Sequence, residues 1–77
     1  MTDNYQAYTA VVNEVMKANY PHDWDGDNTV TIHGVSIGTD MAYSLEGNIR
    51  RRLKKIGYKP SFSYPEQWKM KVSWRKE

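Results

Sequence analysis

Apolar residues recur at helical spacing between Thr39 and Gly57, the best-marked segment of the chain. At about 100° per residue they fall on one stripe, as is typical of an amphipathic helix that packs on a core. This stripe contains Met41, Ala42, Leu45, Ile49, Leu53 and Ile56. Thr39 or Asp40 can cap the first turn and Gly57 supplies a stop, so we expect one helix to fill this interval.

A second helical stripe lies near the amino terminus. Its members are Tyr5, Tyr8, Val12, Val15 and Met16. We expect this helix to run from about residue 4 to residue 19, because Pro21 pushes the residue before it out of the helical region.

Strict alternation of apolar and polar residues marks two strands at the carboxyl end, over residues 58–64 and 68–75. A hairpin through residues 65–67 pairs Tyr64 with Trp68 and Tyr58 with Trp74, which puts the apolar side chains on one face. Pro60 has no amide hydrogen, so we expect 58–64 at the sheet edge and 68–75 further inside. The aromatic rings share their face with aliphatic residues, so we interpret them as core and not as platforms for unpaired bases.

Residues 29–37 contain two short β-rich runs on either side of His33 and Gly34. A two-residue turn there would bring four apolar side chains onto one face of a hairpin. The alternative is one continuous strand with a bulge at Gly34.

These elements predict an α+β fold with the order α-β-β-α-β-β, in one small domain spanning residues 1–77. A four-stranded, mostly antiparallel sheet would carry both helices on one face and leave the other face to water. We expect no acidic residue on that open face. Its predicted members are Lys59, Ser61, Ser63, Lys69, Lys71, Ser73 and Arg75.

Charge is distributed unevenly along the chain, although the overall net charge is only +2. Residues 1–49 hold one lysine against seven acidic residues, a net charge of −6, and residues 50–77 hold ten Lys and Arg against two acidic residues, a net charge of +8. Such asymmetry indicates a negatively charged partner for the basic half, with nucleic acid as the leading class. The alternative is that the two halves fold together and compensate each other.

Two basic surfaces are candidates for binding this partner, one on the second helix and one on the open sheet face. The predicted binding residues are Tyr43, Arg50, Arg51, Lys54, Lys69, Lys71 and Arg75. The two surfaces point in opposite directions, so they form one site only if the ligand wraps an edge or the protein forms a homodimer. The alternative interpretation is a solvated surface, with an ion pair between Glu46 and Arg50. Arg52 falls beside the apolar stripe and needs a route to solvent or a carboxylate partner.

The segment between the first helix and the first strand is acidic and predicted to be a polar loop. Asp23, Trp24, Asp25 and Asp27 form a candidate acidic epitope for a protein partner. A calcium loop counted from Asp23 would need Gly and Glu where Asn28 and Gly34 stand, so we expect no metal site.

The sequence contains no arrangement of residues that is typical of an enzyme, and we expect neither catalysis nor a cofactor. With no cysteine and no long apolar run, we expect a cytoplasmic protein that does not enter a membrane. Two function classes remain: a nucleic-acid-binding module, either DNA-binding or RNA-binding, and a protein-binding modulator or phage-type inhibitor that docks a charged face on a larger complex.

Overall fold

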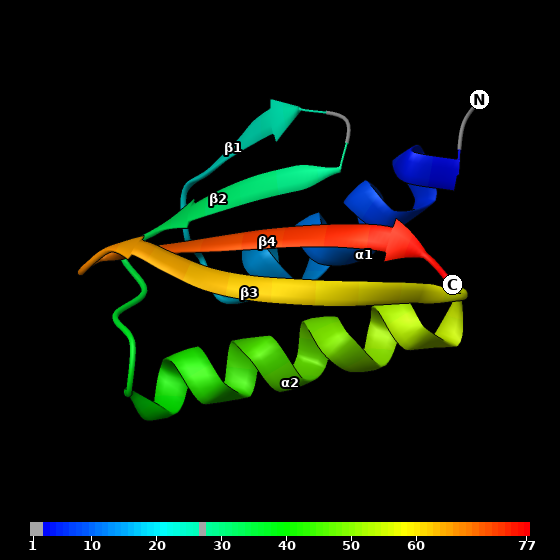
Figure 1. Ribbon diagram of the computed structural model, residues 1–77. Coiled ribbons are helices and arrows are strands. Elements are labelled where there is room, and N and C mark those ends of the chain that lie inside the picture. The colour runs from blue at the N-terminus through cyan, green and yellow to red at the C-terminus, as the bar shows by residue number, and fades with distance from the viewer. Residues whose placement is uncertain (1–2, 27) are drawn as a thin grey trace.

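The chain forms two helices and four strands, as a computed structural model of residues 3–26 and 28–77 shows (Figure 1). Their order is α-β-β-α-β-β, so the predicted α+β fold is confirmed. The elements are α1 (Asp3–Lys17), β1 (His22–Gly26), β2 (Thr29–His33), α2 (Asp40–Lys55), β3 (Tyr58–Glu66) and β4 (Lys69–Lys76).

All neighbouring strands are antiparallel, and the sheet has the order β1-β2-β4-β3. The predicted edge position of residues 58–64 is confirmed, because β3 pairs only with β4. Both helices lie on one face of the sheet, with α1 behind β2 and β4 and α2 alongside β3 (Figure 1). The other face of the sheet is therefore uncovered.

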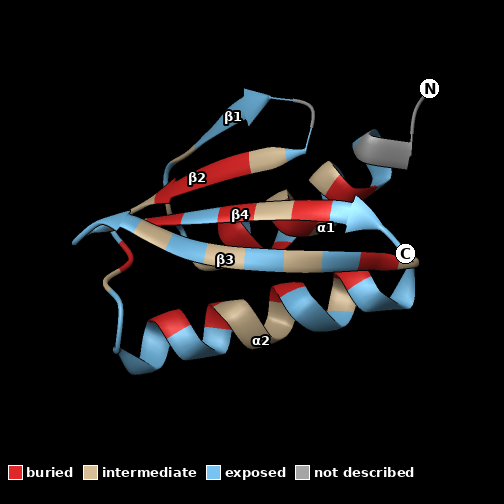
Figure 2. Cartoon of the chain, viewed as in Figure 1, coloured by how far each residue is buried: buried red, intermediate tan, exposed pale blue. Residues whose placement is uncertain are grey.

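The core lies between the helices and the sheet. Figure 2 shows buried residues on the sheet-facing side of α2 and along β2 and β4, whereas β1 is largely exposed. The largest fully buried side chains are Trp74, Tyr58, Ile32, Ile49, Leu53 and Met70. The interpretation of Tyr58 and Trp74 as core residues is confirmed, since they are 2% and 1% exposed.

The second helix begins and ends as predicted. Thr39 caps it, because its hydroxyl oxygen accepts a hydrogen bond from the Ala42 amide at 3.1 Å. Gly57 follows the helix with a φ of 89°, in the left-handed region that favours glycine. The buried stripe is shorter than predicted: Met41 and Ile56, at the two ends of the helix, are 57% and 40% exposed.

The first helix ends at Lys17, two residues before the predicted end. Asn19 has a φ of 63°, and the amides of Asn19 and Tyr20 bond the carbonyls of Met16 and Val15 at 3.1 and 3.2 Å. This is the Schellman pattern, in which a left-handed residue closes the last turn. The helix is thus stopped by Asn19 before Pro21 can act.

The predicted hairpin within residues 29–37 is wrong, and so is the alternative of a single bulged strand. Residues 29–33 form β2, which pairs with residues 22–26, the segment predicted to be a loop. After β2 the chain leaves the sheet: Val35 is buried but Ile37 is 62% exposed. The first hairpin is therefore the one in which Gly26 lies opposite Thr29, and no hairpin turn lies at His33 and Gly34.

The carboxyl-terminal hairpin is present, but its register differs from the prediction by two residues. Phe62 lies opposite Val72 and Pro60 opposite Trp74, with an irregularity between Ser63 and Glu66. A shift of two residues keeps every side chain on its predicted face, because the side-chain period of a strand is two. Trp68 lies in the turn and is 58% exposed, so it is not a core residue.

Candidate functional site

Two cations lie directly opposite each other on the open face of the sheet. Lys59 of β3 and Arg75 of β4 are register partners, and both side chains are exposed. Opposed residues on one face of an antiparallel pair have their Cβ atoms about 5 Å apart, and like charges there destabilise the sheet. Neither cation forms an ion pair within the described part of the chain. An anion between them would remove the repulsion.

Hydroxyl groups line the next row of the same face. Ser61 lies opposite Ser73, which in turn lies opposite Thr29 of β2. The hydroxyls of Thr29 and Ser73 are 3.3 Å apart. A depression of about 340 Å³ joins this row to Lys59 and Arg75. Cations surrounded by hydroxyl donors suit an oxyanion, because phosphate oxygens accept hydrogen bonds and do not donate them.

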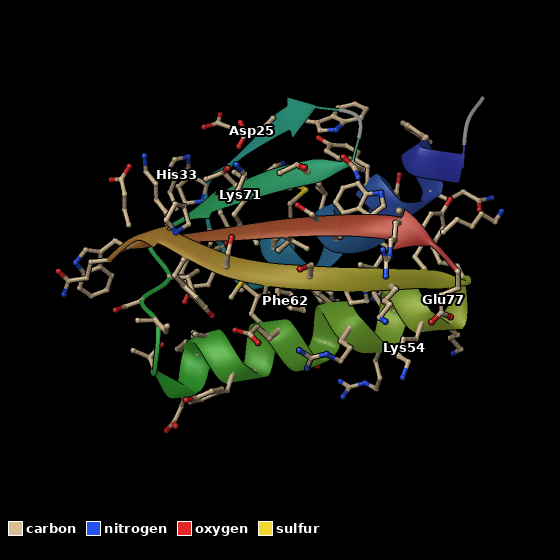
Figure 3. The ribbon with its side chains drawn as sticks, viewed as in Figure 1. Asp25, His33, Lys54, Phe62, Lys71 and Glu77 are labelled. Carbon is tan, nitrogen blue, oxygen red and sulfur yellow. The ribbon has the colours of Figure 1, made fainter. Side chains whose placement is uncertain are left out.

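Lys71 extends this surface toward the middle of the sheet. It lies opposite Ser63 of β3 and Thr31 of β2, and it is exposed. It forms no ion pair with any residue that the structure describes. In Figure 3, Lys71 and Asp25 lie over different strands, and Lys54 projects from α2 on the side away from β1.

The expectation of an open face without acidic residues is wrong. Because residues 22–26 form a strand, β1 brings Asp23 and Asp25 to this face. Asp23 lies 2.8 Å from Nε2 of His33, and the Thr31 hydroxyl donates a hydrogen bond to Asp25. The open face is therefore acidic along β1 and basic along β3 and β4.

Lys69 is compensated within its own hairpin. Its ammonium group lies 3.2 Å from the Glu66 carboxylate, and its side chain is only 35% exposed. It contributes less to the basic surface than Lys71 and Arg75, although all three are predicted to lie on the open face and to bind the partner.

The predicted binding residues of α2 form one row on the helix, and the charges of this row are also partly compensated by partners within the chain. Arg50 lies 3.6 Å from Glu46, as the spacing predicted, and Arg51 donates a hydrogen bond to Asn48. Lys54 is exposed and has no ion-pair partner among the described residues. Tyr43 is 64% exposed, at the amino-terminal end of the same row.

Arg50 connects the two basic surfaces at the β3 edge. Its guanidinium lies 5.0 Å from the centre of the Phe62 ring, in β3. Lys59 belongs to the same strand but points to the open face. A flexible ligand on the open face can therefore reach α2 by passing over one edge strand. This is one of the two arrangements in which the two basic surfaces would form a single site.

Arg52 does not belong to this surface. Its guanidinium bonds to Glu14 of α1. Of the two possibilities considered for Arg52, a route to solvent or a carboxylate partner, the structure has the carboxylate partner. Lys17 lies 3.6 Å from the same carboxylate. The groove between the helices, about 430 Å³, is therefore built around a structural ion pair.

The candidate acidic epitope lies on β1. Trp24 is 48% exposed and stacks on Tyr8 of α1, with ring centres 4.1 Å apart. Asp23 and Asp25 flank it on the opposite side of the strand, and Asp27 lies outside the described residues. Within residues 3–26 and 28–77, no group of three His, Asp or Glu side chains is arranged to hold a metal ion.

Lys59 is predicted to lie on the open face, but it is not among the predicted binding residues. The alternation over residues 58–64 could have identified it, since it shares the face of the β4 cations. Thr29 could not be found in this way, because its position depends on the pairing of β2 with β4.

Comparisons of the chain with protein-family models, with curated proteins and with solved structures gave no match. Neither helix, over the residues that the structure describes, has the length and apolarity needed to cross a membrane.

Proposed function

We propose that this protein is a non-enzymatic nucleic-acid-binding module that contacts the sugar-phosphate backbone. The contacts come from the open face of the sheet, through Lys59, Lys71 and Arg75, with the serine and threonine hydroxyls around them as further donors. Arg50, Arg51 and Lys54 of α2 add contacts beyond the β3 edge. The proposal implies a cytoplasmic protein, because a nucleic-acid partner is available there.

The opposition of Lys59 and Arg75 carries this proposal. A sheet gains no stability from two cations placed across from each other, and nothing among the described residues neutralises them. A phosphate group bound between the two removes that repulsion and releases counterions from the nucleic acid. Contacts of this kind position the ligand without reading its bases, so we expect low sequence specificity.

The proposal is tested by titrating fluorescent oligonucleotides with the wild-type protein and with two triple variants at low salt. One variant changes Lys59, Lys71 and Arg75 to Ala, and the other changes Arg50, Arg51 and Lys54 to Ala. We expect the sheet variant to lose about tenfold or more in affinity for every sequence, and the helix variant to lose less because two of its cations have internal partners.

Lys55→Ala is the control, since it removes one exposed cation of α2 that belongs to neither set. Circular dichroism is used to check that each variant is folded. No binding by the wild type, or wild-type affinity in the sheet variant, would refute the proposal.

A second candidate function is a modulator that docks on another protein through β1. It is favoured by one observation: Asp23, Trp24 and Asp25 of the edge strand β1 are each exposed, the two acids on the open face and Trp24 on the other side of the strand. A pull-down after nuclease treatment would then return one stoichiometric partner, and Trp24→Ala would abolish its capture. An empty eluate counts against this function.

A further inference from the structure

The sign of the charge changes across the open face, from one edge of the sheet to the other. One row of register partners runs from Asp23 on β1 through Thr31 on β2 and Lys71 on β4 to Ser63 on β3. Asp25 adds a second acid on the β1 side, and Lys59 and Arg75 add two cations on the β3 and β4 side. The acids thus form one margin of the surface that the proposed function assigns to phosphates.

The strand spacing decides how far this acidic margin acts. Neighbouring strands lie about 4.8 Å apart, so β4 is about 10 Å from β1. Surface charges are largely screened beyond about 8 Å at physiological ionic strength. A phosphate over β3 or β4 therefore feels little repulsion from Asp23 and Asp25, whereas a phosphate over β2 lies within about 5 Å of the β1 strand.

The strip that accepts phosphates is consequently narrow. A duplex carries two backbones, separated by a minor groove of about 6 Å or a major groove of about 12 Å. When one backbone lies over β3 and β4, a second backbone on the β1 side comes over the acids. On the other side, the edge of the sheet is thickened by α2, which packs against β3 and by itself has a diameter of about 10 Å, so this edge does not fit into a groove.

A single strand meets neither obstacle. It has one backbone, and it can bend over the β3 edge toward Arg50 and Lys54. Along β4, Lys71, Ser73 and Arg75 point to the same face at steps of about 6.8 Å, a spacing that successive phosphates of an extended strand can follow.

We propose that the protein selects single-stranded over double-stranded nucleic acid, with phosphates on β3 and β4 and with Asp23 and Asp25 of β1 repelling a second strand. This inference rests on the proposed function. It adds a repulsive element to the attractive one, which is how selectivity between related ligands is commonly achieved.

The test compares a single strand of about 12 nucleotides, within the range of single-strand modules, with the duplex of the same sequence. We expect the wild type to bind the single strand at least roughly fivefold more tightly. This is the factor for one repulsive pair of unit charges about 4 Å apart in water.

Two variants examine the cause of the selectivity. Asp23→Asn and Asp25→Asn should each raise the affinity for the duplex by roughly fivefold and leave the affinity for the single strand within about twofold. Both changes retain a side-chain oxygen that accepts a hydrogen bond, so the contacts with His33 and Thr31 can persist. Asp40→Asn, in the first turn of α2, makes the same charge change on the helix layer and should leave the ratio of affinities unchanged.

The outcomes separate this inference from the proposed function. Equal affinities of the wild type for both ligands, or Asn variants that leave the ratio unchanged, would overturn the inference alone. Absence of binding to both ligands would overturn the proposed function and the inference with it.

Discussion

Arg52 of α2 bonds to the carboxylate of Glu14 in α1, and this ion pair joins the two helices. Glu14 is 7% exposed, and it is one of two buried polar residues among those described. Its charge is held by Arg52 and, at 3.6 Å, by Lys17. Loss of Arg52 would leave a buried carboxylate with one exposed partner.

Arg52→Ala should therefore lower the free energy of unfolding by about 1–3 kcal/mol, the usual cost of leaving a buried charged group poorly paired. Urea denaturation at neutral pH measures this. Arg51→Ala is the matched control, because Arg51 bonds to Asn48 at the surface and to no other side chain among the described residues, and its effect should stay within about 0.5 kcal/mol. Equal effects of the two changes would show that the pair with Glu14 does not stabilise the helix contact.

Tyr58→Phe should leave stability unchanged or raise it by up to about 1 kcal/mol. The Tyr58 side chain is 2% exposed, and its hydroxyl has no hydrogen-bond partner among the described residues. Such a group loses its bonds to water on folding and gains none in return. Thermal denaturation tests this prediction, and a clear drop in the melting temperature would mean that the hydroxyl is bonded in the folded protein.

The stabilising contribution of Tyr64 should be lost at alkaline pH, where its phenol ionises. Burial, and then the hydrogen bond to Glu46, raise the pKa of the Tyr64 phenol above its ordinary value of 10.0. The folded state therefore holds this proton more tightly than the unfolded state does. The resulting stabilisation is fully present below about pH 10 and is lost as the pH rises from there toward the higher pKa of the folded state.

Urea unfolding at about pH 7 and about pH 10.5 checks the effect of Tyr64. The difference in stability between the two pH values should be smaller in Tyr64→Phe than in the wild type. Tyr5→Phe, which changes an exposed ring away from Tyr64, should behave like the wild type. A wild-type pH response in Tyr64→Phe would contradict the prediction.

Strong periodicity made most of the fold predictable. The stripe around Leu45, Ile49 and Leu53 defined α2, and the alternation over residues 58–75 defined the last two strands and their faces. The register of that hairpin was not predictable in the same way, because a slip of two residues leaves the hydrophobic pattern unchanged. The Gln67–Trp68 turn and the irregularity before Glu66 determine the actual register.

The first hairpin was missed because β1 buries little. Its one large inward side chain is Trp24, and what it packs against is Tyr8 of a distant helix, a contact that local pattern does not reveal. The Asp25-Gly26 pair, typical of hairpin turns, would have indicated a turn two residues too early, because both residues belong to β1. Without β1, the acidic margin of the open face could not be foreseen, and neither could the selectivity inferred from it.

The salt dependence of single-strand binding tests the central claim, that the cations of the open sheet face contact phosphates, most directly. The logarithm of the association constant should fall linearly with the logarithm of salt concentration, with a slope of about −0.7 for each phosphate contact. Lys71→Ala and Arg75→Ala should each make the slope shallower by about 0.7, while Lys55→Ala on the helix layer leaves it unchanged. Slopes in the two sheet variants equal to that of the wild type, or no binding even at low salt, would contradict the account.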